Sequence, residues 1–220
     1  MRTRCASPLA VVLAISTLVS FAACSKERHT PTAPAEPVVS IEDPSVVVQR
    51  FRTAWVTRDT SALDSCLAYT FGYGFACRDS AGQLFLDGGP DRDSTLLGAA
   101  RLFRFGSASH PFATSIDVAL DSLAITLDHH DPVHRSNAVC HADVTVRTSA
   151  DTLRLGGHVA FALVRGDVFG ITLPPDSTRW FLGACLEVAF HAAGSTKTGA
   201  AECDSLLTTT WSYALRRYLE

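Results

Sequence analysis

His141 and Asp143 are the residues of this chain whose types and spacing best suit acid–base chemistry. A carboxylate can orient an imidazole, so the pair could act as a general base. The two residues lie two positions apart in a predicted strand, residues 138–148, and therefore share one of its faces. The alternative is that both belong to a polar face exposed to water. The alternation of polar and apolar residues along this strand favours that alternative.

A second cluster holds side chains of the types that bind zinc: Asp128, His129, His130, Asp131 and His134. Adjacent histidines in a turn between strands point in different directions, and Pro132 is typical of an ordinary loop. We therefore predict no metal site and no cofactor. The sequence also has no glycine-rich phosphate loop, no nucleophile elbow and no Cys-x-x-Cys pair.

The start of the chain predicts export, with residues 1–23 as a signal peptide. Two arginines precede an uncharged run, residues 8–23, which is too short for a membrane-spanning helix. Residues 21–24, Phe-Ala-Ala-Cys, resemble the lipobox of bacterial lipoproteins, although leucine usually stands first. The resemblance implies a lipid on the sulfur of Cys24 and an anchor in the cell envelope, at the outer membrane if the cell is Gram-negative. The alternative is an ordinary secretory signal in which Cys24 is incidental.

Residues 24–42 contain three prolines and no apolar period, which predicts a disordered, lipidated tether. We expect a folded domain at residues 43–192, followed by a loop and a helix at 193–220. The chain carries 19 basic and 22 acidic side chains and a net charge of −3. This balance argues against a nucleic-acid partner.

Residues 43–77 are expected to form a helix, a shorter helix and a strand. Asp43 followed by Pro44 is typical of a helix start, and Asp59 begins the second helix. The first helix has an apolar stripe that includes Phe51 and Trp55. From Thr70 the period changes to two, which predicts a strand with one aromatic face: Phe71, Tyr73, Phe75 and Cys77.

The rest of the chain predicts a sheet of long strands. A short strand at 83–87 ends at the Gly88-Gly89-Pro90 sequence, and Asp93 caps the next helix. Four long strands follow, at residues 116–128, 138–148, 153–165 and 179–190. Apolar residues change parity near Asp121, so we expect a β-bulge at that point. Trp211 is expected to dock a last helix.

This order of elements resembles the nuclear-transport-factor-2-like superfamily. The resemblance covers residues 43–190 and is carried by the strand at 180–188 and by residues of the opening segment: Phe51, Ala54, Trp55, Arg58, Asp59 and Phe71. It implies an α+β fold in which a curved, mixed or antiparallel sheet wraps around three helices like a cone. Members of the superfamily include isomerases, dehydratases and proteins without catalysis, so the fold does not decide the function.

The apolar strand faces are expected to cover the helices, because their burial stabilises the fold. That arrangement places His141, Asp143, His158 and Glu187 on the outer face of the sheet. The interior would then form a ligand pocket without an acid or base, lined by aromatic residues: Trp55, Phe71, Tyr73, Phe75, Phe103, Phe161 and Trp180.

We therefore expect a lipid-anchored protein of the cell envelope that binds a small apolar ligand or a protein partner without catalysis. The alternative is an acid–base enzyme of the isomerase or dehydratase kind. It would use a pocket in the cone, with the Tyr73 hydroxyl beside His141 and Asp143.

The outer face of the last two strands and the cysteines leave further alternatives. Residues 156–164 and 181–189 present small or apolar side chains outward, which predicts a homodimer through this face. The alternative is that the loop at 192–210 covers it.

The disulfide pairing of five cysteines stays open: Cys66, Cys77, Cys140, Cys185 and Cys203. Only Cys66–Cys77 is disfavoured, because a strand would separate them by about 25 Å.

Overall fold

The computed structural model of the chain describes residues 40–79, 81–190 and 200–220. Val39–Glu220 forms one compact unit. The predicted signal peptide, the lipobox with Cys24 and most of the predicted tether lie outside the described residues, as do residues 191–199 of the predicted loop. Within the described residues, no helix is long and apolar enough to cross a membrane.

The described chain contains helices and strands in the predicted order. The helices are α1 (Pro44–Thr57), α2 (Thr60–Asp64), α3 (Arg92–Ala100), the π-helical turn η1 (Arg101–Phe105), α4 (Ala200–Leu207) and α5 (Trp211–Arg217). The strands are β1 (Leu67–Arg78), β2 (Leu84–Asp91), β3 (Ala113–Leu127), β4 (Arg135–Thr148), β5 (Thr152–Gly166) and β6 (Asp176–Phe190). Helix α4 lies in a segment for which the sequence predicts a loop.

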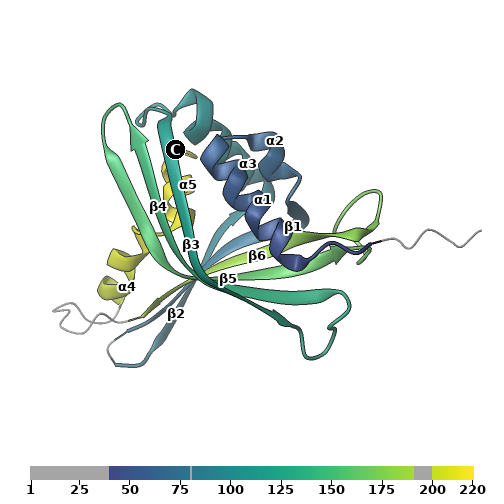
Figure 1. Cartoon of the computed structure of the whole chain (residues 1–220). Helices are drawn as coiled ribbons and strands as arrows, with labels where there is room; N and C mark the ends of the chain where they lie inside the picture. Colours follow the sequence, from purple (N-terminus) through teal and green to yellow (C-terminus); the bar gives the residue numbers. More distant parts are fainter. Residues whose placement is uncertain (1–39, 80, 191–199) are drawn as a thin grey trace, which may run out of the picture. The chain divides into compact units, whose positions relative to one another are not determined.

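The six strands form one sheet in the order β2-β1-β6-β5-β4-β3. Neighbouring strands are antiparallel except β1 and β6, which are parallel. The sheet bends strongly, and α1, α2 and α3 lie on its concave side (Figure 1). The predicted α+β fold, a curved mixed sheet around three helices with a further helix near the C-terminus, is confirmed.

The predicted starts of the first two helices are confirmed. The Asp43 carboxylate accepts the N–H of Ser45 at 2.7 Å, and the Asp59 carboxylate accepts the N–H of Ala62 at 3.0 Å. Each bond satisfies an N–H group that has no partner inside its helix. Between the two helices, Arg58 adopts a left-handed conformation with φ of 56° and ends α1.

The prediction for residues 83–93 is wrong in two details. Strand β2 does not stop at Gly88-Gly89-Pro90 but continues to Asp91, and it is Asp91, not Asp93, that caps α3 through the N–H of Ser94. Gly89 is needed in the strand because a Cβ there would lie 2.5 Å from the Cβ of Tyr73. Here glycine permits a close approach of two strands, a role that sequence alone does not distinguish from a turn.

The folded unit begins earlier than Asp43. The N–H of Glu42 donates to the carbonyl of Thr178 at 2.9 Å, and its carboxylate forms an ion pair with Arg50. The indole Nε1 of Trp180 donates to the carbonyl of Glu42 at 3.0 Å. Residue 42, predicted to belong to the tether, is therefore bound to β6.

A disulfide joins Cys77 of β1 to Cys203 of α4, with the Cα atoms 5.7 Å apart. Cys66, Cys140 and Cys185 are free and buried. The exclusion of a Cys66–Cys77 bond is thus confirmed, and the open pairing is resolved. The bond ties the C-terminal helices to the sheet across a sequence separation of 126 residues.

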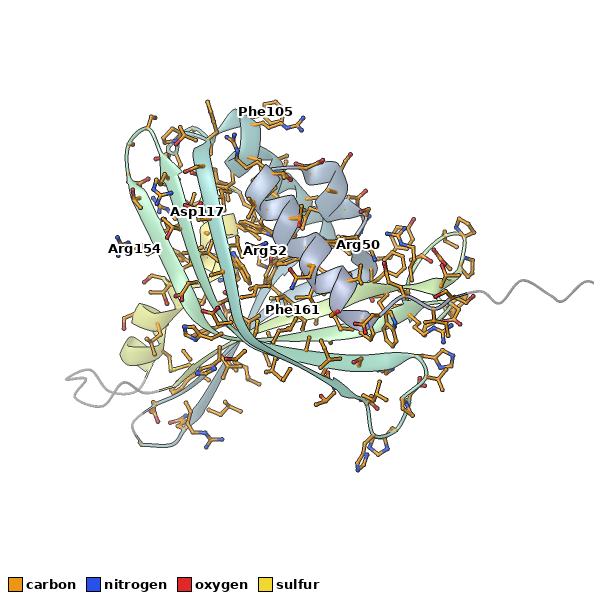
Figure 2. The ribbon with its side chains drawn as sticks, viewed as in Figure 1. Arg50, Arg52, Phe105, Asp117, Arg154 and Phe161 are labelled. Carbon is orange, nitrogen blue, oxygen red and sulfur yellow. A yellow bond between two sulfur atoms is a disulfide. The ribbon has the colours of Figure 1, made fainter. Side chains whose placement is uncertain are left out.

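An aromatic cluster fills the centre of the cone. The rings of Phe51 and Trp55 from α1 and Phe161 from β5 meet Trp211 from α5, with centroid distances of 5.5 Å from Phe51 to Trp211 and 5.8 Å from Trp55 to Trp211. Phe161 lies between the sheet and α1 (Figure 2). The expectation that Trp211 docks the last helix is confirmed.

Candidate functional site

The structure does not bring His141, Asp143 and Tyr73 together. His141 and Asp143 lie on the outer face of β4, with 45% and 66% of their side chains exposed and 3.8 Å between Nε2 and Oδ1. Tyr73 is buried among the core residues on the other face of the sheet. His141 instead lies beside His158, with a ring separation of 5.4 Å. Among the described residues, neither His141 nor Asp143 lines the pocket beside Glu187.

The loop between β3 and β4 forms turns of its own. The Asp128 carboxylate accepts the backbone N–H groups of His130 and Asp131, and Nδ1 of His134 lies 2.9 Å from the Asp131 carboxylate. Over the residues that the structure describes, no group of three His, Cys, Asp or Glu side chains is arranged to hold a metal ion.

Most of the aromatic residues predicted to line a pocket are packed in the core. Trp55, Phe71, Tyr73, Phe103, Phe161 and Trp180 are buried in the main apolar cluster. Of the predicted set, only Phe75 lines the pocket beside Glu187 that is described below. The other six residues make the filled centre of the cone, so the cavity lies away from its predicted place.

Strand β6 carries a candidate site residue, Glu187, whose predicted position on the outer face is wrong. Leu182 pairs with Leu163 and Ala184 pairs with Ala162, so Gly183 has no partner on β5 and forms a β-bulge. Beyond the bulge, side-chain parity is reversed. Glu187 therefore points to the concave side, where only 5% of it is exposed, and the prediction that it lies on the outer face is wrong.

The buried Glu187 carboxylate binds the start of helix α5. Its two oxygens accept the backbone N–H groups of Trp211 and Ser212, at 2.5 and 3.0 Å. These are N–H groups of the first helical turn, which have no partner inside the helix. The positive end of the helix dipole also favours a negative charge at this position.

A pocket of about 260 Å³ opens beside Glu187, between the concave face of β4, β5 and β6 and the C-terminal helices. Its apolar walls come from strands and helices that are far apart in sequence. They include Phe75, Val144, Leu155, Val159, Leu206 and Trp211. Among the described residues that line it, Glu187 is the only carboxylate. His158 also borders the pocket, but its ring lies beside His141, which is on the predicted outer face.

Burial decides the protonation of Glu187. Desolvation raises the pKa of its carboxyl from the ordinary 4.5 to about 7, although the bonds from Ser212 and Trp211 lower it. Burial likewise raises the pKa of the Tyr73 phenol and of the Cys185 thiol well above their ordinary values, and the charge of Glu187 raises both further. Near neutral pH the site therefore holds one carboxyl that can gain or lose a proton, beside two groups that stay protonated.

The site can do two things chemically. Largely apolar walls beside one buried carboxyl suit a small, mostly apolar ligand that makes an oriented hydrogen bond. A carboxyl with a pKa near the working pH could also exchange a proton with such a ligand. Gly183 was the available sequence signal for this site, since an isolated glycine inside a strand often marks a bulge.

We predict that Glu187 makes the protein less stable as the pH rises from 5 to 8. The folded pKa of about 7 exceeds the ordinary 4.5, so the folded state binds more protons between these values, and stability is lost as the pH rises through 7. The difference corresponds to roughly 3 kcal/mol of unfolding free energy.

Urea unfolding of the wild type and of Glu187→Gln at several pH values measures this effect. The stability of the wild type relative to Glu187→Gln should fall between about pH 5 and pH 7 and become constant above about pH 8, where Glu187 is ionised in both states. Parallel pH profiles for the two proteins would show that Glu187 is not the responsible group.

No protein-family model and no curated protein matches the chain. Several solved structures are similar to the chain. They include a protein of unknown function from Mycobacterium tuberculosis (13% identity, 79% of this chain and 87% of that chain, TM-score 0.47). Two others are described as NTF2-like, one of unknown function in nutrient uptake from Rhodospirillum rubrum (16%, 66% and 96%, TM-score 0.43) and one with a cystatin-like fold from Novosphingobium aromaticivorans (14%, 74% and 84%, TM-score 0.41).

At these identities and TM-scores, the likeness says nothing about the activity of this chain. Two observations carry the assignment of the fold: the order of helices and strands, and the curved mixed sheet around α1, α2 and α3. The domain therefore has the curved mixed sheet around three helices that the sequence resemblance implies.

Proposed function

We propose that this protein is a binding module of the cell envelope that takes up a small, largely apolar ligand in the Glu187 pocket, without catalysis. The observation that carries the proposal is the pocket itself, a cavity of about 260 Å³ with aromatic and aliphatic walls and one buried carboxyl. A lipid on Cys24 would hold the module at a membrane.

The hydrogen bonds of Glu187 favour binding over catalysis. Both carboxylate oxygens already accept a backbone N–H of α5, which fixes the carboxyl in one orientation. A fixed carboxyl still has free lone pairs, so it can accept one more hydrogen bond from a ligand hydroxyl or amide. When protonated, it can donate a hydrogen bond to a ligand carbonyl.

The second candidate is an acid–base enzyme of the isomerase or dehydratase kind, with Glu187 in place of His141 and Asp143. The observation that favours it is the pKa of Glu187, about 7 because of burial. A carboxyl with this pKa can act as a general base and then return the proton. The buried Tyr73 hydroxyl, which has no hydrogen-bond partner among the described residues, is the nearby phenol.

We predict that 2-tetralone, a bicyclic ketone, binds the pocket with a measurable heat. Val144→Phe should weaken binding by about tenfold or more, because the larger ring occupies ligand volume. The matched control is Thr145→Phe, since Thr145 is the next residue on β4 and points to the outer face. Isothermal titration calorimetry of the three proteins measures the effect. Equal affinities for Val144→Phe and the wild type would contradict a ligand site at this pocket.

The same complex separates the two candidate functions. Proton abstraction beside the ketone exchanges hydrogen for deuterium in heavy water, which NMR measures. For a binding module, we expect the wild type and Glu187→Gln to give the background exchange rate. Faster exchange by the wild type that Glu187→Gln abolishes would establish acid–base catalysis instead.

For the anchor, we predict that Cys24→Ser abolishes labelling of the protein by radioactive palmitate and releases it from the membrane fraction. The reason is that the sulfur of Cys24 is the expected site of the lipid. Membrane fractionation of cells that express the two forms provides the measurement. A mutant that stays in the membrane fraction would contradict the proposed anchor.

We also propose that two copies pair through the outer face of the sheet. The bulge at Gly183 changes which residues of β6 belong to this face. Cys185 and Ala189 lie on the concave side, and Phe181 is buried under Ile171. The remaining outer row runs across neighbouring strands through small or apolar residues: Gly74, Leu186, Ala160 and Val139. Two-fold symmetry needs only one such self-complementary surface.

Ala162→Arg should therefore convert a dimer to a monomer, because it places a charge beside this row. Light scattering of the unit without its N-terminal segment measures the mass, and Ala162→Ser is the control that keeps a small side chain. A monomeric wild type at tens of micromolar would exclude the dimer.

A further inference from the structure

Two loops at one end of the sheet present apolar side chains to solvent. The loop between β5 and β6 exposes Phe169 completely (101%) and Leu173 by 77%. The loop between β3 and β4 exposes Val133 by 56%. We call residues 128–134 and 167–175 the tether-side loops, because they lie near the point where the chain enters the folded unit.

The tether-side loops are held together, so their apolar side chains have fixed positions. The backbone N–H of Arg165 donates to the carbonyl of His134 at 2.9 Å, and its guanidinium reaches the carbonyl of Val133 at 3.4 Å. The second loop is fastened to β1 by the N–H of Tyr69, which donates to the carbonyl of Ile171 at 3.1 Å. The exposed residues therefore stand on a preformed surface.

Two acidic side chains of these loops, Asp131 and Asp167, lie beside basic side chains, and Asp128 accepts backbone N–H groups of its own loop. Asp167 lies 3.6 Å from the guanidinium of Arg165 and 4.0 Å from the ring of His134. Asp131 contacts the other ring nitrogen of His134 at 2.9 Å. Pairing lowers the cost of bringing these carboxylates to an apolar or zwitterionic surface.

The chain enters the folded unit beside the same loops. Glu42 is bound to Thr178 and Trp180, which follow the loop between β5 and β6. In Figure 1 the start of the described chain (purple) lies close to that loop (green). A chain attached at Cys24 would thus approach the unit at the end that carries Phe169 and Leu173.

We propose that the tether-side loops rest on the lipid bilayer, with Phe169 and Leu173 inserted at the boundary between the lipid headgroups and the acyl chains. The inference depends on the proposed anchor at Cys24. The composition of residues 24–42 predicts a root-mean-square span of roughly 25 Å, whereas a folded unit of this size is roughly 40 Å across. The anchor therefore keeps the membrane nearer to the Glu42 end than to the opposite end. Transfer of exposed Phe and Leu side chains from water to the membrane interface lowers the free energy.

The test attaches the protein to vesicles and asks which end meets the lipid. A chain that begins at Cys24 is coupled through that thiol to a maleimide phospholipid in phosphatidylcholine vesicles. The other free thiols are buried, and Cys77 and Cys203 form the disulfide. Phe169→Trp is then compared in vesicles with and without brominated phosphatidylcholine, which quenches tryptophan at the depth of the acyl chains.

The matched control is Phe105→Trp, because Phe105 is also exposed, by 76%, and lies at the top of the view in Figure 2, on the π-helical turn. The native Trp55, Trp180 and Trp211 are at most 4% exposed and contribute a constant background. We expect brominated lipid to reduce the added emission of Phe169→Trp by about twofold or more and to leave Phe105→Trp unchanged. Leu173→Trp should behave as Phe169→Trp does.

Equal quenching of Phe169→Trp and Phe105→Trp, or none of either, would overturn the proposal. Because the coupling imposes the anchor chemically, this result does not depend on natural acylation of Cys24. Palmitate labelling tests the anchor separately, so failure of the anchor and failure of the loop contact are distinguishable.

Discussion

The pocket depends on the contact between the buried Glu187 carboxylate and the first N–H groups of α5. A buried carboxylate costs several kcal/mol unless hydrogen bonds compensate it, and Trp211 and Ser212 supply two of them. The same contact stabilises helix α5, because a helix of seven residues is too short to be stable alone. Its position brings Trp211 into the aromatic cluster. One polar contact therefore positions α5 and, through Trp211, one wall of the pocket and the centre of the core.

Two different interactions, a disulfide and a hydrogen-bonded carboxylate, hold the C-terminal helices on the sheet. The Cys77–Cys203 disulfide fixes α4 covalently to β1, and the Glu187 carboxylate fixes α5 to β6 by hydrogen bonds and charge. The first responds to redox conditions, which suits an exported protein, and the second responds to pH. Leu206 of α4 and Trp211 of α5 both line the pocket, so both interactions set its shape.

The sequence predicted most of the fold and missed the candidate site for one physical reason. Near Asp121, clearly apolar residues change parity, and the predicted bulge is present, with Ser122 at φ of 58°. Around Gly183 the pattern has no such contrast, because Cys185 and the alanines of β6 fit either face. The sequence pattern therefore predicts no bulge in this strand and places Glu187 on the outer face. The close approach of Gly89 to Tyr73 was equally invisible, since it is a tertiary contact.

The place of the cavity follows from the distribution of side-chain volume on the concave face. The aromatic rings around Trp211 occupy the centre of the cone, where the sequence predicted the pocket. Where the pairing of β5 with β6 ends, at His158 and Val188, small residues line the pocket: Ala142, Gly156, Gly157 and Ala189. Phe75 and Trp211 border this region but do not fill it. Among the described residues, these small side chains leave the volume beside Glu187 open, and the same openness leaves the carboxyl within reach of a ligand.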